Sequence, residues 1–131
     1  MDDIRIVPFL FQEHQFLPHV ADVIARDLER SVTIAEIDFD ASYAFDPSRK
    51  QFNSTQILKG LLSMNGDSPK KILGITDVDL FIPILTHVYG EAQLGGKAAI
   101  VSTFRLKDDL KVFTTDAFKE RIGGYASEVS F

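Results

Sequence analysis

Two carboxylates stand close together in the string Thr-Asp-Val-Asp, at Asp77 and Asp79, along or just after a predicted strand. A pair of carboxylates at a suitable separation can act as general acid and general base. On a strand, however, two positions that are two residues apart share one face. Such a pair usually ends the strand as a solvated surface feature. We therefore expect Asp77 and Asp79 to face solvent and not to catalyse a reaction.

Histidine is the second residue type that can do chemistry here. The chain has three, His14, His19 and His87, and it has no cysteine. His14 and His19 are five positions apart, so they do not form the His-x-x-x-His pair that binds zinc from one helix face. No nucleophile elbow (Gly-x-Ser-x-Gly) and no glycine-rich phosphate loop occurs. The histidines are interpreted as surface or loop residues, and no catalytic or metal-binding residue is assigned.

Polar residues also precede the Gly95-Gly96 pair, at Glu91 and Gln93. Two interpretations are open: these side chains line a groove, or they only solvate the edge of a sheet. The edge itself is a physical feature in either case. Its unpaired backbone groups can bind an extended peptide as an added strand.

Alternating strand and helix patterns must position these side chains. Runs of β-branched and aromatic residues predict strands, with a short one at the sheet edge: 3–11, 32–39, 70–81, 86–94 (edge) and 97–106. Apolar residues at helical spacing predict helices: about 16–30, then from a cap at Asn53 or Ser54 to Met64, and a last stretch capped by Thr114 or Thr115. Residues 41–52 are interpreted as a turn or a short added strand.

This order of elements predicts an α/β fold: a three-layer-like mixed β-sheet with helices packed on it. The first three strands should be parallel, because right-handed crossovers through helices join them. The glycine pair should make the edge strand and the last strand an antiparallel hairpin. At 131 residues, a single domain spanning 1–131 is expected.

Charge and hydropathy exclude several classes of partner. Acidic residues outnumber basic ones, 19 to 14, which gives a net charge of −5 and argues against nucleic acid. No stretch has the length of a transmembrane helix, so we expect no membrane partner. The start of the chain, MDDIRIVPFL, has acidic residues where an export signal needs positive charge. We therefore expect a cytoplasmic location.

Residues 71–106 are similar to the archaemetzincins, a branch of the metzincin clan of zinc metallopeptidases. Nine residues of this segment match the family pattern: Asp77, Asp79, Gly90, Glu91, Ala92, Gly95, Gly96, Ser102 and Arg105. The resemblance extends over 3–122 and implies a metzincin-like upper subdomain. It also implies that 86–94 forms the edge strand of a substrate cleft. The residues that would face an extended peptide there are His87, Tyr89, Gly90, Glu91 and Gln93.

The same family holds its catalytic zinc with a His-Glu-x-x-His-x-x-Gly-x-x-His helix and a second zinc with cysteines. After residue 122 this chain reads GGYASEVSF instead. We therefore expect an archaemetzincin-like amino-terminal domain that is truncated before the zinc helix, either by a frameshift or as a half-domain. No cofactor is expected in this chain, although the full-length family uses zinc, and the chain as given is expected to be proteolytically inactive.

Two other functions are compatible with the sequence. The first is a non-enzymatic interaction module that uses an exposed sheet edge, or forms a homodimer through apolar surface left open by a short last helix. The second is a small-molecule enzyme that uses Asp77 or Glu91. Sedimentation separates the interaction module from a peptidase subdomain, because a monomeric chain would argue against the interaction module.

Overall fold

The computed structural model describes residues 3–12, 14–93 and 96–105. Its helices and strands follow one another in the order β1 (Ile4–Pro8), η1 (His14–Phe16), α1 (Leu17–Leu28), β2 (Val32–Ile34), η2 (Ser42–Ala44), β3 (Phe45–Asp46), β4 (Gln51–Asn53), α2 (Ser54–Asn65), β5 (Lys71–Thr76), β6 (Leu80–Ile82), β7 (Leu85–Val88), β8 (Gly90–Ala92) and β9 (Ala98–Ser102). The α/β class is confirmed. The last predicted helical stretch lies outside the described residues.

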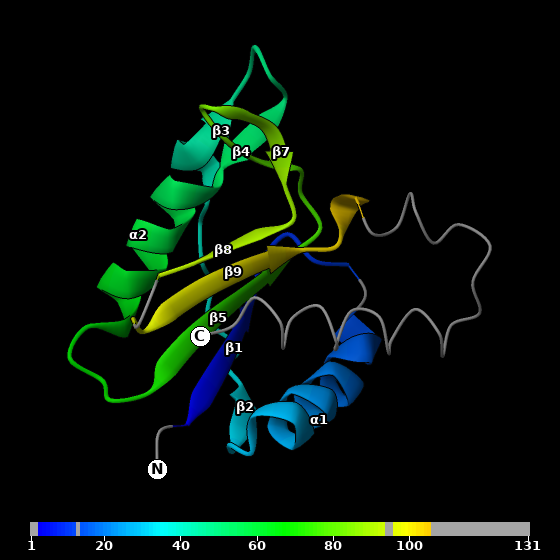
Figure 1. Ribbon diagram of the computed structural model, residues 1–131, viewed down its shortest axis with the longest axis vertical. Helices are drawn as coiled ribbons and strands as arrows, with labels where there is room; N and C mark the ends of the chain where they lie inside the picture. The colour runs from blue at the N-terminus through cyan, green and yellow to red at the C-terminus, as the bar shows by residue number, and fades with distance from the viewer. Residues whose placement is uncertain (1–2, 13, 94–95, 106–131) are drawn as a thin grey trace.

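A five-stranded mixed sheet is the centre of the fold, with the strand order β2-β1-β5-β9-β8. Strands β2, β1, β5 and β9 are parallel, and β8 is antiparallel to β9. Both predictions about strand direction are therefore confirmed. Helix α1 covers one face of the sheet and α2 covers the other (Figure 1). This gives the three layers that the sequence predicts.

Helix α1 begins where the sequence places it, because Pro18 is tolerated only in the first turn. Its apolar stripe packs on the sheet through Leu17, Val20 and Ile24, against Ile4 and Ile6 of β1. Each of these side chains is buried, with at most 3% of its surface exposed. Burial of such a side chain contributes about 1.5–3 kcal/mol. The stripe is thus sufficient to fix α1 on its face of the sheet.

Helix α2 is capped by Asn53, whose side chain accepts a hydrogen bond from the Gln56 amide at 3.1 Å. This confirms one of the two predicted caps. Ile57 and Leu61 face the sheet and belong to a cluster with Ile100 of β9. Helix α2 also contacts β8, and its first two residues, Ser54 and Thr55, hydrogen-bond to Glu91 of that strand.

A second, four-stranded sheet with the order β3-β4-β6-β7 was not predicted. The sequence suggested a single strand over 70–81, but the turn at 77–79 ends β5 and sends β6 into this sheet. The predicted edge strand 86–94 is likewise divided, because β7 pairs with β6 and β8 pairs with β9. Short runs of apolar residues do not reveal which sheet a strand joins.

The predicted strand 32–39 is also shorter than expected. Pairing to β1 ends where the Ala35 amide donates to the Ile6 carbonyl at 2.8 Å, and residues 36–39 then leave the sheet.

Among the described residues, no helix combines the length and the apolar character needed to cross a membrane.

Candidate functional site

Strand β8 forms one edge of the five-stranded sheet (Figure 1). On its inner side, the Ser102 amide donates to the Tyr89 carbonyl at 2.8 Å, and the Gln93 amide donates to the Ala98 carbonyl at 3.0 Å. Backbone groups of an antiparallel strand alternate in direction along the chain. The N–H and C=O groups of Gly90 and Ala92 therefore point away from β9, towards the side where no strand of the described part of the chain pairs.

Gly90 lets β8 approach β9 closely. A Cβ atom at this position would lie 2.5 Å from the Ile100 carbonyl oxygen and 3.3 Å from the Cα of Val101. Both atoms belong to the backbone of the neighbouring strand, so a side chain would have to push the two strands apart. The glycine of the predicted edge is thus needed for strand pairing.

Glu91 ties β8 to helix α2. Its Oε1 accepts hydrogen bonds from the hydroxyls of Ser54 at 2.5 Å and Thr55 at 3.0 Å, and its Oε2 lies 3.1 Å from the Thr55 hydroxyl. Ser54 and Thr55 are the first two residues of α2, where the helix dipole favours a negative charge. Of the two interpretations left open by the sequence, neither describes this side chain, which holds two elements together.

Gln93 stabilises the turn between β8 and β9. Its Oε1 accepts a hydrogen bond from the Lys97 amide at 3.1 Å, and its carbonyl accepts one from the Gly96 amide at 2.9 Å. The rings of His87 and Tyr89 pack edge to face, with centroids 5.8 Å apart. The five predicted cleft residues therefore divide into two turn or anchor residues, one close-approach glycine and one aromatic pair.

Asp77 joins the ends of two strands and a loop. It accepts a hydrogen bond from the Thr103 hydroxyl at 2.5 Å and another from the Gln12 amide at 2.7 Å. Its own amide donates to the Leu10 carbonyl at 3.1 Å. Asp77 keeps an intermediate exposure, and beyond the predicted contact with solvent it connects the segments after β1, β5 and β9.

Asp79 has a comparable role towards the second sheet. Arg105 binds it through two hydrogen bonds, Nε to Oδ1 at 3.0 Å and Nη2 to Oδ2 at 2.8 Å, and Gln51 donates to Oδ2 at 3.0 Å. Only 11% of the Asp79 side chain is exposed. The prediction of a solvent-facing pair is therefore wrong here. No local pattern indicates these partners, because they are 26 and 28 positions away along the chain.

The described residues do not fit a zinc ion. Among them, no three His, Cys, Asp or Glu side chains are grouped so that they can hold a metal. His14 lies in η1, His19 in α1 and His87 in β7, so the three histidines come from different elements.

Sequence comparison relates the chain to archaemetzincins of archaea. It is 32% identical to the archaemetzincin of Archaeoglobus fulgidus over 109 residues, which are 79% of this chain and 65% of the relative. It is 45% identical to that of Methanocaldococcus jannaschii over 67 residues, 51% and 35% of the two chains. The chain thus spans from about a third to two thirds of the length of these relatives. No protein-family model matches it.

Solved structures agree with the sequence comparison. The crystal structure of the Archaeoglobus fulgidus archaemetzincin complexed with malonate has a TM-score of 0.72 and 31% identity, covering 92% of this chain and 70% of that one. A zinc-dependent peptidase from Methanocorpusculum labreanum has a TM-score of 0.80 at 22% identity, over 96% and 78% of the two chains. Because its sequence identity is only 22%, the likeness to this second protein shows a shared fold and nothing further.

These comparisons correct one expectation from the sequence. A chain without a cofactor was expected, but the relatives are archaemetzincins and a structural neighbour is a zinc-dependent peptidase. The expectation is wrong because it counted only the ligands visible in the printed sequence.

Proposed function

Because this chain belongs to the archaemetzincin family, we propose that it acts in zinc-dependent hydrolysis of peptide bonds, as the part of the enzyme that binds the peptide backbone. One observation carries the proposal. The N–H and C=O groups of Gly90 and Ala92 point outwards from an edge strand that is anchored on its other sides. Such an edge can accept an extended substrate as an added strand.

The anchoring explains how so short a strand can serve this purpose. Strand β8 has three residues, and on one side it pairs with β9. On its helix side, Glu91 is held by Ser54 and Thr55 at the start of α2. A strand held in this way pays little ordering entropy when a peptide binds, which favours affinity.

The peptide contacts alone support only weak binding. Gly90 and Ala92 offer two donors and two acceptors, and a hydrogen bond of this kind contributes about 1 kcal/mol net. Together they correspond to a dissociation constant no tighter than roughly millimolar. The sequence contains no His-Glu-x-x-His string. We therefore expect the 131 residues by themselves to bind peptide but not to hydrolyse it.

NMR titration of the 15N-labelled chain tests the binding. An acetylated and amidated Ala-Val pentapeptide should shift the amide signals of Gly90 and Ala92 more than those of residues in α1. The same peptide with N-methylated amides is the control, because it cannot donate to the edge. Equal shifts with both peptides, or shifts confined to other elements, would contradict strand addition.

A peptidase assay tests the second part. We expect no turnover of fluorogenic peptides by the chain alone, with added zinc or without it. Joining the residues that follow in a full-length relative should restore turnover that a chelator abolishes. Turnover by the chain alone would overturn the expected inactivity, but it would not contradict the proposed binding of peptide to β8.

A homodimerising interaction module is the second candidate. Ile84, in the turn between β6 and β7, is 87% exposed, and Leu85, the first residue of β7, is 48% exposed. Exposed apolar side chains are typical of partner surfaces. Sedimentation of the chain and of an Ile84→Ser variant tests this. A dimer that the variant abolishes would support it, and a monomer at every concentration would exclude it.

A further inference from the structure

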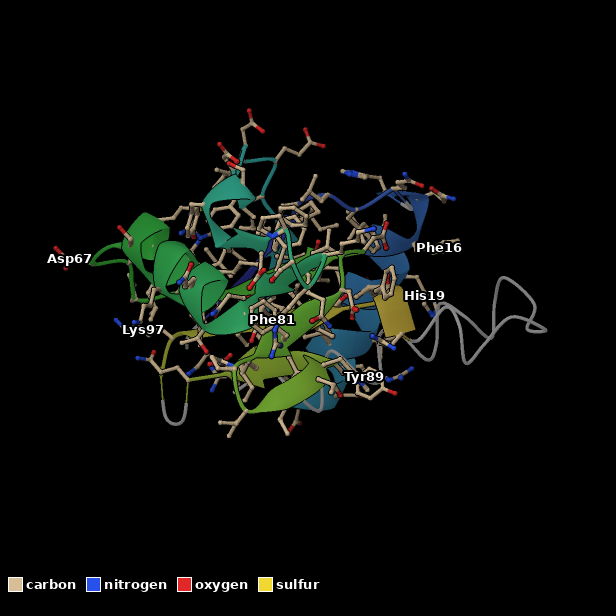
Figure 2. The ribbon with its side chains drawn as sticks, turned by 90° about the horizontal axis from the view of Figure 1, so that it is seen from above. Phe16, His19, Asp67, Phe81, Tyr89 and Lys97 are labelled. Carbon is tan, nitrogen blue, oxygen red and sulfur yellow. The ribbon has the colours of Figure 1, made fainter. Side chains whose placement is uncertain are left out.

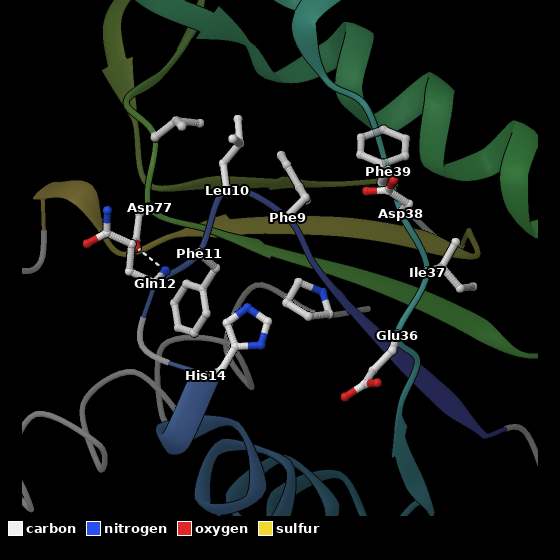
Figure 3. Close-up of a pocket in the computed structure, with 12 residues that line it drawn as sticks. Phe9, Leu10, Phe11, Gln12, His14, Glu36, Ile37, Asp38, Phe39 and Asp77 are labelled. Carbon is white, nitrogen blue, oxygen red and sulfur yellow. Dashed lines mark hydrogen bonds between the residues drawn. The ribbon is translucent and has the colours of Figure 1, made fainter.

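A cavity of about 870 Å³ opens at the carboxyl ends of β1, β2 and β5 (Figure 3). Strand β1 lies between the other two, with β2 on one side and β5 on the other. The chain leaves β1 through α1 to reach β2, and it returns through α2 to β5 on the opposite side. In open α/β sheets, ligands bind at such a reversal of strand order. The peptide edge at β8 is at the other side of the sheet.

Apolar side chains, three of them phenylalanines, form much of the cavity lining. Phe9 and Phe11 follow β1, with 5% and 4% of their surface exposed, and Phe39 lies opposite them. The rings of Phe9 and Phe39 meet edge to face, with centroids 5.1 Å apart. The ring of His14 lies 6.1 Å from that of Phe11. These rings are packed into the core beneath the cavity, and Leu10, 55% exposed, adds an apolar side chain at its surface.

The rim of the cavity is acidic. Glu36 and Asp38 project from one side of the segment after β2, towards the loop that carries Phe9 and His14, and Ile37 projects from the other side (Figure 3). Both residues are exposed, and within the described part of the chain neither carboxylate has a hydrogen bond or an ion pair. Asp77 adds a third carboxylate. Among the described lining residues, only His14 is basic.

We propose that this cavity binds an organic cation, a primary amine carried on an apolar body. The apolar body fits against Leu10 and Phe39, and the ammonium group fits the carboxylates of Glu36 and Asp38. Apolar walls with a few convergent polar groups are the usual form of a small-molecule site. An anionic ligand would meet like charge at the rim.

Titration of the 15N-labelled chain with phenethylammonium chloride tests this proposal. The neutral 2-phenylethanol and the anionic phenylacetate have a similar ring and serve as controls. We expect the amine to shift the amide signals of 9–12 and 36–39 and to bind roughly fivefold more tightly than the alcohol. Phenylacetate should bind most weakly. Equal binding of all three, or no shift in these two segments, would overturn the proposal.

Two double variants separate the site from a general effect of charge. Glu36→Gln with Asp38→Asn should reduce the preference for the amine over the alcohol to nearly one. Asp22→Asn with Asp67→Asn removes the same net charge elsewhere and should leave the preference unchanged. Asp67 precedes β5 and projects from the opposite end of the sheet (Figure 2). If both variants lose the preference equally, only the net charge of the protein attracts the amine. If the amine does not bind, the proposed binding of a peptide to β8 is unaffected, because different residues form that edge.

Discussion

The carboxylate of Glu91 lies 2.5 Å from the hydroxyl of Ser54, so that the edge strand of the main sheet is fastened to the first turn of a helix. The Ser54 side chain is completely buried, and Thr55 makes two further contacts with the same carboxylate. An acidic residue in an edge strand can therefore be part of the framework of a site without facing its ligand.

Glu91→Ala should lower the free energy of unfolding by about 2 kcal/mol, because two buried or half-buried hydroxyls lose a charged acceptor. Glu91→Gln should cost less, since the amide oxygen still accepts one hydrogen bond. Urea denaturation measures both effects. Glu29→Gln is the control on an exposed position and should change stability by less than about 0.5 kcal/mol. Equal values for Glu91→Ala and Glu29→Gln would show that the contact does not hold β8.

Gly90→Ala should detach β8 from β9, because the added methyl group would lie 2.5 Å from the Ile100 carbonyl oxygen. We expect a loss of about 2 kcal/mol and faster amide exchange at Glu91 and Ile100. Gly66→Ala is the comparison. Gly66 has φ of +58° but open space around it, so its replacement should strain the backbone and leave exchange in β8 unchanged. Protected amides in β8 of the Gly90 variant would contradict this account.

Asp79→Ala should destabilise the protein by about 2 kcal/mol, because Arg105 and Gln51 both lose their acceptor. The loss of stability is modest because 36% of the Arg105 side chain is exposed, so solvent screens the ion pair. Asp27→Asn offers a matched control, because Asp27 pairs with Arg26 at 3.2 Å on an exposed surface. That variant should change stability by less than about 0.5 kcal/mol. Thermal denaturation distinguishes the two.

Asp46 should make the protein more sensitive to acid. The Ser48 hydroxyl, followed by the Arg49 and Ser48 amides, lowers the pKa of its carboxyl below the ordinary value of 3.8. A lowered pKa in the folded state contributes stability above 3.8, and this contribution disappears as the pH falls through the folded-state pKa. The Tm of Asp46→Asn should therefore lie below that of the original chain at pH 7 and approach it at pH 2.

Ser48→Ala provides the check on the cause of this effect. It removes the hydrogen bond that contributes most to the lowered pKa, so its Tm should also approach that of the original chain in acid. A constant difference in Tm between the original chain and Asp46→Asn over the whole pH range would refute the linkage.

Periodicity and caps predicted the main elements well. Helix α1 was confirmed by its apolar stripe and Pro18, and α2 by the Asn53 cap, because these signals act within a few residues of one another. The directions of the strands followed from the lengths of their connections. These features are local, so a single sequence contains them.

The second sheet and the roles of the polar residues could not be predicted in this way. The turn after Thr76 divides one apolar run between two sheets, and the choice of sheet depends on partners far away in the chain. Likewise, Glu91 meets Ser54 across 37 positions and Asp79 meets Arg105 across 26. The hydroxyls of Ser54 and Thr55 at a helix start were the one signal that an acceptor would lie there.

The position of β1 between β2 and β5 has a consequence for synthesis on the ribosome. Ile6 of β1 pairs with Leu73 of β5, which emerges only after both helices have been made. Until then, one long side of β1 has no neighbouring strand, and apolar residues intended for the interior stay accessible to water and to chaperones. Pairing over such separations also slows folding. Pauses in translation before Lys71 should therefore be the moments when the nascent chain aggregates most readily.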